Sequence, residues 1–216
     1  MEEIEILYGY KMTHDTGFAP NPYQGALTLA TCKPLIRKYA RIGYWISGWT
    51  SNSVQTRGND KPFHFKDEEQ RLIYLAKVSE VLSFGEYWNK YPQKRQPEES
   101  IKGEKECFKS CANILVTKND DISFCGDNIY EPDTNEPSGF IRHENPHHGE
   151  KEKARDLSGE HVLVCKEFYY FGAENAVFVK KKGVVHRWKK FSTDEGQKII
   201  DFVTNNYSEG LYPKKK

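Results

Sequence analysis

The sequence predicts a single α+β domain over residues 1–216, with a few short helices and either a strongly curved mixed sheet or a small β-barrel. Three observations support this. The length of 216 residues suits one domain. Aromatic residues make up 13% of the chain and favour strands. Neither glycine-rich phosphate loop, GxGxxG or GxxxxGK[ST], occurs, which disfavours a parallel nucleotide-binding sheet.

The first half of the chain predicts strands with one short helix between them. Pro34 suits the first turn of a helix, because its missing N–H would have no partner there. Ser83 and Glu86 have the spacing of a capping box and predict a second short helix. The polar residues 51–66 predict a loop. The expected elements are strands at 4–12, 44–49 and 71–82 and a helix at 34–40.

The second half predicts two long insertions, a strong strand and a C-terminal helix. Charged, proline-bearing stretches at 91–106 and 131–158 predict mobile insertions. Residues 161–172 predict a strand, and 176–179 and 184–188 predict short ones. Ser192 and Glu195 form a second capping-box pattern that opens the last helix.

Charge and cysteine content limit the class of protein. A net charge of +1 disfavours sequence-blind wrapping of nucleic acid, which needs a strong basic excess. The basic stretches at 180–182, 187–190 and 214–216 fit a solvated face or, alternatively, phosphate contacts beside a pocket. Five cysteines in irregular spacing disfavour a disulfide framework. Without a signal-peptide pattern or a long apolar run, we expect a cytoplasmic protein with no membrane partner.

The loop at residues 13–22 is the densest polar feature. Glycine, aspartate, asparagine and two prolines fix such a loop, and rigid loops at strand ends present side chains to ligands. A turn that only routes the chain is the alternative. The candidate ligand-binding residues here are His14, Asp15, Thr16 and Asn21.

A second polar cluster, residues 126–130, places Asp127, Asn128 and Tyr130 together. A carboxylate beside an amide can read the hydrogen-bonding edge of a base, although a plain β-turn is the alternative. We expect this turn and the 13–21 loop to lie side by side in one pocket, because a ligand site needs groups from distant segments.

Aromatic and basic residues complete the predicted pocket. Core packing is the ordinary role of buried aromatic side chains, but Trp49 and Tyr170 are candidates for stacking on a base. Lys33 and Arg37 are candidates for contact with phosphate.

The sequence predicts no metal and no cofactor. The pattern Cys107-x3-Cys111 with His143-x3-His147 has ligand types that suit zinc, but its parts lie in irregular, charged segments. Cys32, before the Pro34 helix and beside Lys33, is a candidate nucleophile, with a structural buried cysteine as the alternative.

Four ordered motifs resemble the nucleotide-modification-associated domain families, and the type-two domain above all. They are residues 14–22, Cys32-Lys33-Pro34-x-Ile36-Arg37, residues 126–130 and residues 168–172. The resemblance covers about residues 4–180 and implies a role linked to altered bases of nucleic acid. The family pattern has an Asp after Gly43 where this chain has Tyr44, so an activity that needed that Asp would be affected. A weaker likeness is to PUA-like barrels, including EVE and ASCH domains.

Together these features predict recognition or processing of a modified base, in a nucleotide or in nucleic acid, through an aromatic-lined pocket. One alternative is an enzyme with Asp15 or Asp127 as general acid or base and Cys32 as a further candidate nucleophile. A protein-interaction module without a small ligand is the other. The sequence leaves open the choice between binder and enzyme, the particular nucleotide and the oligomeric state.

Overall fold

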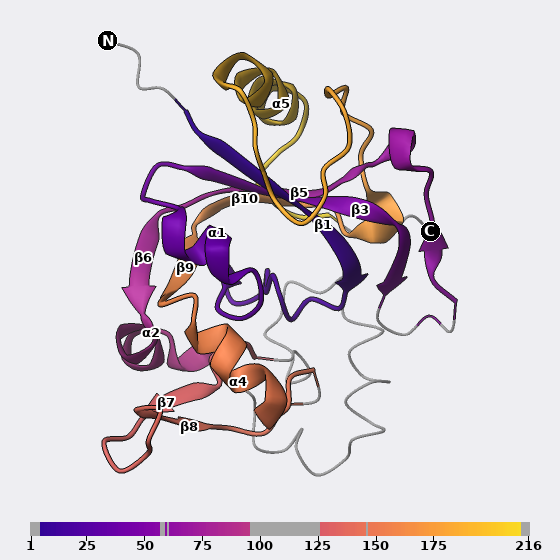
Figure 1. The fold of residues 1–216 in the computed structure, drawn as a ribbon. Coiled ribbons are helices and arrows are strands. Elements are labelled where there is room, and N and C mark those ends of the chain that lie inside the picture. The colour runs from indigo at the N-terminus through magenta and orange to yellow at the C-terminus, as the bar shows by residue number, and fades with distance from the viewer. Residues whose placement is uncertain (1–4, 57–58, 60, 96–125, 146, 213–216) are drawn as a thin grey trace.

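A computed structural model describes residues 5–56, 59, 61–95, 126–145 and 147–212, and the structural statements below concern these residues. They form layers around a central sheet (Figure 1). Helix α5 (Thr193–Asn206) covers one face of this sheet, and a smaller sheet with helix α1 (Pro34–Tyr39) lies on the other side. The α+β class is therefore confirmed. Within the described residues the large sheet is open, with edges at β11 and β12, and does not close into a barrel.

The large sheet has seven strands and is mixed. β1 runs parallel to β3, and β10 runs parallel to β12, while the other pairings are antiparallel. In order across the sheet the strands are β11 (Lys189–Lys190), β1 (Leu7–Asp15), β3 (Trp45–Thr56), β5 (Leu72–Lys77), β10 (Glu167–Tyr170) and β12 (Gly210–Leu211), with β4 (Phe63–His64) paired to β3.

The smaller sheet and the remaining elements form the other half of the molecule. Among the described residues no helix is long and apolar enough to cross a membrane. The small sheet is β2 (Leu27–Leu29), β9 (His161–Cys165) and β6 (Glu80–Ser83); the other elements are α2 (Phe84–Lys90), the hairpin β7 (Tyr130–Pro132) and β8 (Phe140–Arg142), α4 (Glu150–Leu157), and the 3-10 turns η1 (Asp67–Glu69), η2 (Pro92–Lys94) and η5 (Ala173–Asn175).

The core consists of apolar side chains packed between these layers. The two sheets bury one cluster between them, and α5 buries another through Ile199, Ile200 and Val203. Each such aliphatic side chain stabilises the fold by about 1.5–3 kcal/mol when it is fully buried. α5 is therefore held to the sheet mainly by its apolar face.

Local sequence signals for helices are confirmed. Pro34 occupies the first turn of α1, Ser83 and Glu86 form the predicted capping box of α2, and the Ser192 side chain accepts a hydrogen bond from the backbone of Glu195. These signals act within four residues, so they do not depend on the rest of the fold.

Strand boundaries differ from the predictions where the chain changes sheets. The strand predicted at 71–82 is two strands, because Val78 still bonds the large sheet through Tyr44 whereas Ser79 bonds Val164 of the small one. The strand predicted at 161–172 divides in the same way at Lys166. Chains turn such corners where two packed sheets meet.

Two predicted loops contain regular structure. The loop predicted at 51–66 is wrong in part, since β3 continues to Thr56 and pairs with β4. Residues 131–158, predicted as a mobile insertion, include β8 and α4. Most of 91–106 lies outside the described residues. At 176–188, where two short strands were predicted, we find within the described chain one isolated bridge, Leu72 to Val177.

Candidate functional site

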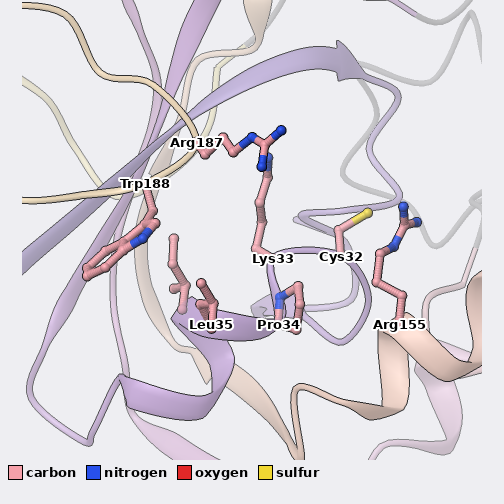
Figure 2. A pocket seen from close by; sticks show the side chains of 8 residues that line it. Cys32, Lys33, Pro34, Leu35, Arg155, Arg187 and Trp188 are labelled. Carbon is pink, nitrogen blue, oxygen red and sulfur yellow. The ribbon is translucent and has the colours of Figure 1, made fainter.

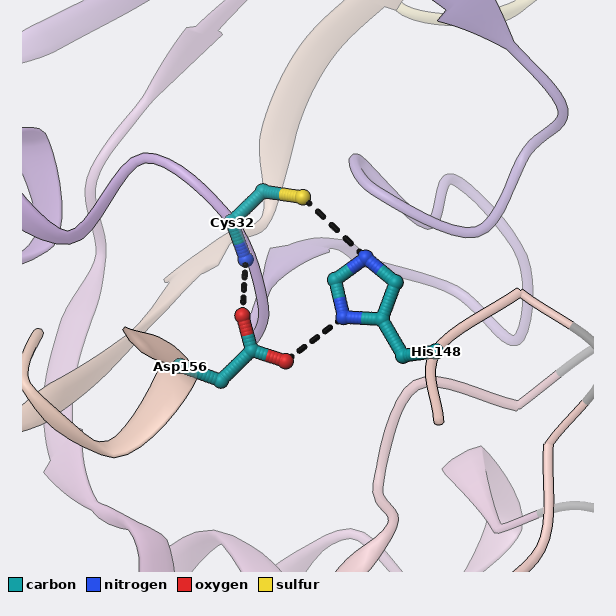
Figure 3. Close-up of side chains that lie close together, drawn as sticks. All are labelled: Cys32, His148 and Asp156. Atoms are coloured by element: carbon teal, nitrogen blue, oxygen red, sulfur yellow. Dashed lines mark hydrogen bonds and ion pairs between the residues drawn. The ribbon is translucent and has the colours of Figure 1, made fainter. Parts of the chain in front are cut away.

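A thiol, an imidazole and a carboxylate are linked in series near α1 and α4 (Figure 3). Cys32 Sγ lies 3.3 Å from His148 Nε2. The other ring nitrogen, Nδ1, lies 2.6 Å from Asp156 Oδ2. A nucleophile hydrogen-bonded to a base, with the base oriented by a third group, is the arrangement that activates a weak nucleophile for covalent catalysis.

Three loop and helix positions bring these side chains together. Cys32 immediately precedes the Lys33 cap of α1, His148 precedes α4, and Asp156 lies in the last turn of α4. Cys32 and Lys33 have φ angles of 57° and 42°. Consecutive side chains in the left-handed region cost on the order of 1–2 kcal/mol each, and such backbone persists only where neighbouring contacts hold it.

Those contacts come from Asp156 and Arg37. The backbone N–H of Cys32 donates to Asp156 Oδ1 at 2.9 Å, and Arg37 Nε donates to the Cys32 carbonyl at 2.8 Å. The guanidinium of Arg37 also donates to the carbonyl oxygens of His161 and Asp156. Gly159 leaves room for it, because a Cβ there would lie 2.4 Å from the Arg37 guanidinium carbon. The backbone on both sides of the Cys32 α-carbon is therefore held in place, and this fixes the position of the thiol.

Opposite charges set the protonation of the series. Burial alone would lower the pKa of His148, but its hydrogen bonds to Asp156 and Cys32 raise that pKa to about 9. Burial would raise the pKa of Asp156, but the hydrogen bond and charge of His148 hold it below its usual value. Tyr130 also donates to Asp156 Oδ2, at 3.0 Å. At neutral pH the pair is therefore an imidazolium and a carboxylate.

The same three residues could also be considered as metal ligands, since their donor atoms lie within 4.8 Å of one another. However, Cys32 and Asp156 address opposite nitrogens of one imidazole. An ion bound at either ring nitrogen would replace the hydrogen bond that this nitrogen makes now, so the hydrogen-bonded series and a three-ligand centre are alternative states of these residues. The geometry matches a proton relay rather than a three-ligand centre.

A pocket of about 400 Å³ opens beside the thiol and the imidazole. Cys32 is half-buried, His148 is 8% exposed and Asp156 is fully buried behind them. Of the residues predicted from sequence, His14, Thr16, Cys32 and Lys33 meet here. The other lining residues are Tyr10, Met12, Thr13, Phe18, Ala19, His147, His148, Glu152 and Arg155.

A second cavity of about 710 Å³ shares Cys32, Lys33 and Arg155 with the first. Residues 34–36 of α1 line it. In Figure 2 Trp188 lies at one end, and the Arg187 side chain extends from beside Trp188 to above Lys33. We call this second cavity the basic groove. The thiol therefore lies where two open spaces meet.

Asp15 and Tyr170 bond each other in the interior. The Tyr170 hydroxyl and the backbone N–H of Ala173 donate to the Asp15 carboxylate. Burial raises the pKa of Asp15, although these two hydrogen bonds oppose the shift. Trp49 is fully buried, and its ring N–H donates to Ser47 at 2.9 Å. These placements favour structural roles for the three residues.

The 126–130 turn meets one end of the 13–21 loop inside the protein. Asp127 accepts hydrogen bonds from Thr28 and Tyr87, both at 2.7 Å. Lys94, also buried, donates to the side chain and carbonyl of Asn21. Burial lowers the pKa of Lys94 to about 8 and raises that of Asp127, and their opposite charges partly offset both shifts. Neither Asp127 nor Asn21 lines the two cavities.

The remaining predicted residues support the framework. Asn128 donates to the carbonyls of Tyr87 and Tyr91, and Arg37 is fully buried rather than exposed to a phosphate. Cys107 and Cys111 lie outside the described residues. His143 contacts Glu131 at 2.6 Å.

Sequence reasoning missed His148, Asp156 and Arg155. All three come from the charged segment 131–158, where no motif marks them. One signal could have indicated a partner for Cys32. A candidate nucleophile needs a base, and the chain has two adjacent histidines, His147 and His148, far from Cys32 in sequence.

Comparison with known proteins identifies a family for this chain. No significant match was found among curated proteins or among solved structures. The family model described as nucleotide modification associated domain 2 matches residues 4–212, which is nearly the whole chain and agrees with the resemblance seen in its motifs. The chain belongs to the nucleotide modification associated domain 2 family.

Proposed function

We propose that the protein is a thiol-dependent enzyme that removes or transfers an acyl-type group carried by a modified nucleotide. One observation carries this: the Cys32 sulfur, 3.3 Å from His148 Nε2, lies at the junction of two cavities, while Asp156 holds the other ring nitrogen from behind. The family description, nucleotide modification associated, supports a nucleotide as the carrier.

The relay supplies both proton transfers that such a reaction needs. The Cys32 thiolate attacks a carbonyl carbon, the S–C bond forms, and the bond from that carbon to the nucleotide breaks. The His148 imidazolium gives its proton to the departing nitrogen or oxygen. Neutral His148 then takes a proton from water, the C–O bond forms, the S–C bond breaks and the thiolate returns. Asp156 orients the ring and stabilises its charged form throughout.

Mass spectrometry can test this with mononucleotides and short oligodeoxynucleotides that carry N-acylated bases. The protein should release the acyl group and, after an acid quench, carry it on Cys32 as a thioester. A Cys32→Ser variant should lose the release by about a hundredfold or more. Cys165→Ala is the matched control, since Cys165 is buried and lines neither cavity. Equal release by Cys32→Ser and the unchanged protein would refute the proposal.

Recognition of a modified base without catalysis is the second candidate function. The favouring observation is that the aromatic residues Tyr10, Phe18 and His147 are among those that line the smaller cavity, and Phe18 stacks on His147 with ring centroids 5.0 Å apart. Aromatic walls suit a planar base. Binding of a modified nucleotide that is retained in Cys32→Ser, with no conversion by the unchanged protein, would favour this function.

A further inference from the structure

The charged residues that line the basic groove are all positive. Its lining includes the cations Lys33, Arg155 and Arg187, and none of the lining residues is acidic. Within the described residues, none of these three cations forms an ion pair with a carboxylate within 4 Å. Three cations around one cavity, with no acidic residue in its lining, indicate an anionic ligand.

Lys33 is the innermost of the three cations. Its ammonium donates to the Lys11 carbonyl at 3.2 Å and lies 4.6 Å from the centre of the Tyr10 ring. Burial lowers the pKa of Lys33, and the charge of Arg155 lowers it further, although Cys32 opposes this. An anion between Lys33 and Arg155 would relieve that repulsion.

The far end of the groove is aromatic. Trp188 is 46% exposed, whereas Trp45 and Trp49 are buried. In Figure 2 the Trp188 ring lies at one end beside Leu35, Lys33 lies midway, and Cys32 and Arg155 lie at the other end. An exposed indole on an apolar floor is a platform on which any base can stack.

We propose that the basic groove is a nucleotide-binding subsite, in which Arg155, Arg187 and Lys33 hold a phosphate and Trp188 stacks on a base. This deepens the proposed function and rests on it for the placement of the reacting group at Cys32. A nucleotide held in this way presents its other end to the thiol. The same phosphate and base could belong to a free nucleotide or to a single strand.

Tryptophan fluorescence titrations of the Cys32→Ser protein test the subsite without any turnover. The ligands are the four deoxynucleoside 5′-monophosphates, the matching nucleosides and a single-stranded 12-mer. We expect the monophosphates to bind about tenfold or more tightly than the nucleosides, because a charged phosphate adds charge-assisted hydrogen bonds. Binding of the monophosphates assigns the site to free nucleotides, and binding of the 12-mer alone assigns it to a strand.

Variants localise the binding. Calorimetric titration, which does not depend on the Trp188 fluorophore, should show that Arg187→Ala and Trp188→Ala each weaken binding about tenfold, as loss of one charged contact or one stacked base does. Lys198→Ala is the matched control, since that lysine is exposed and pairs with Asp194 on α5. Binding that is unchanged in both groove variants, or absent for every ligand, would overturn the subsite. Because the protein lacks the thiol, failure here is distinct from failure of the Cys32 chemistry.

Discussion

Asp127 and Asp156 are both fully buried, yet their surroundings differ in a way that separates framework from chemistry. Asp127 is enclosed by the hydroxyls of Thr28 and Tyr87 and lies near buried Lys94. Asp156 instead bonds a ring, His148, whose other edge meets a half-buried thiol at an open pocket. Burial of a carboxylate therefore does not by itself indicate a functional role. A hydrogen-bond partner whose other side opens to a cavity, as His148 does, is the feature that indicates one.

The largest expected effect is on stability at the enclosed carboxylate. Asp127→Asn removes the negative charge that offsets the charge of buried Lys94, and it weakens the two hydrogen bonds from Thr28 and Tyr87, each worth about 1.5–3 kcal/mol to a charged acceptor. Urea denaturation should show this loss in the free energy of unfolding. The rate at which iodoacetamide alkylates Cys32 should stay within about twofold under native conditions. A stable Asp127→Asn protein with an inert Cys32 would reverse the two assignments.

Asp156→Asn is the matched change at the other carboxylate. It leaves the His148 imidazolium without its carboxylate, so it should cost about 3 kcal/mol of stability, the lower end for a broken buried ion pair. It should also slow alkylation of Cys32 about tenfold, because His148 loses the partner that orients it. Peptide mass spectrometry measures the rate at this cysteine alone. An unchanged rate would contradict a role for Asp156 beyond folding.

The His148–Asp156 pair also predicts a pH window for stability. The folded-state pKa of His148 is raised to about 9, above its usual 6.5, so its contribution is complete below about pH 6.5 and is lost as the pH rises through 9. The pKa of Asp156 is lowered, so its contribution is present above its usual value and is lost in acid. The pH-dependent part should amount to about 1–3 kcal/mol. Urea melts from pH 5 to 9.5 should show it as the difference between the unchanged protein and His148→Gln, because the lowered pKa of Lys94, about 8, gives both proteins the same opposite change above pH 8.

The smallest expected effect is at Tyr130. Tyr130→Phe removes one donor to Asp156, which should cost about 1.5 kcal/mol of stability, the lower end for a hydrogen bond to a charged group. Alkylation of Cys32 should slow by less than in Asp156→Asn, since the His148 contact remains. Tyr91→Phe serves as a control, because its hydroxyl bonds Glu80 of β6 and does not contact Asp156. An effect at Tyr130 equal to that of Asp156→Asn would mean that the hydroxyl itself takes part in the relay.

Much of the local structure could be predicted from sequence, because it depends on near neighbours. Pro34 starts α1, and Ser83 and Ser192 accept the N-terminal hydrogen bonds of α2 and α5. The points at which the chain passes from one sheet to the other, Ser79 and Lys166, could not be predicted. An alternating apolar pattern is the same whichever sheet the strand joins. The regular structure at 131–158 was hidden by charge, because the short amphipathic helix α4 buries little besides Asp156.

The candidate site shows the same division. His14, Thr16, Cys32 and Lys33 were found because a rigid loop and a helix start mark them. Asp15, Trp49 and Asp127 carried equally strong local signals but lie in closed interior networks. His148 and Asp156 come from a segment more than a hundred residues beyond Cys32. Only the tertiary contacts through Arg37 and the Cys32 backbone bring them together, and no local pattern encodes those contacts.

The pH dependence of Cys32 alkylation shows whether the His148 imidazolium activates the thiol. Iodoacetamide labelling from pH 5 to 9.5, resolved by peptide mass spectrometry, gives the rate at Cys32 in the unchanged protein and in His148→Gln. If the imidazolium activates the thiol, Cys32 should react at least about tenfold faster in the unchanged protein near pH 6.5, and the two rates should converge above pH 9 as His148 loses its proton. Identical profiles in the two proteins would contradict the account.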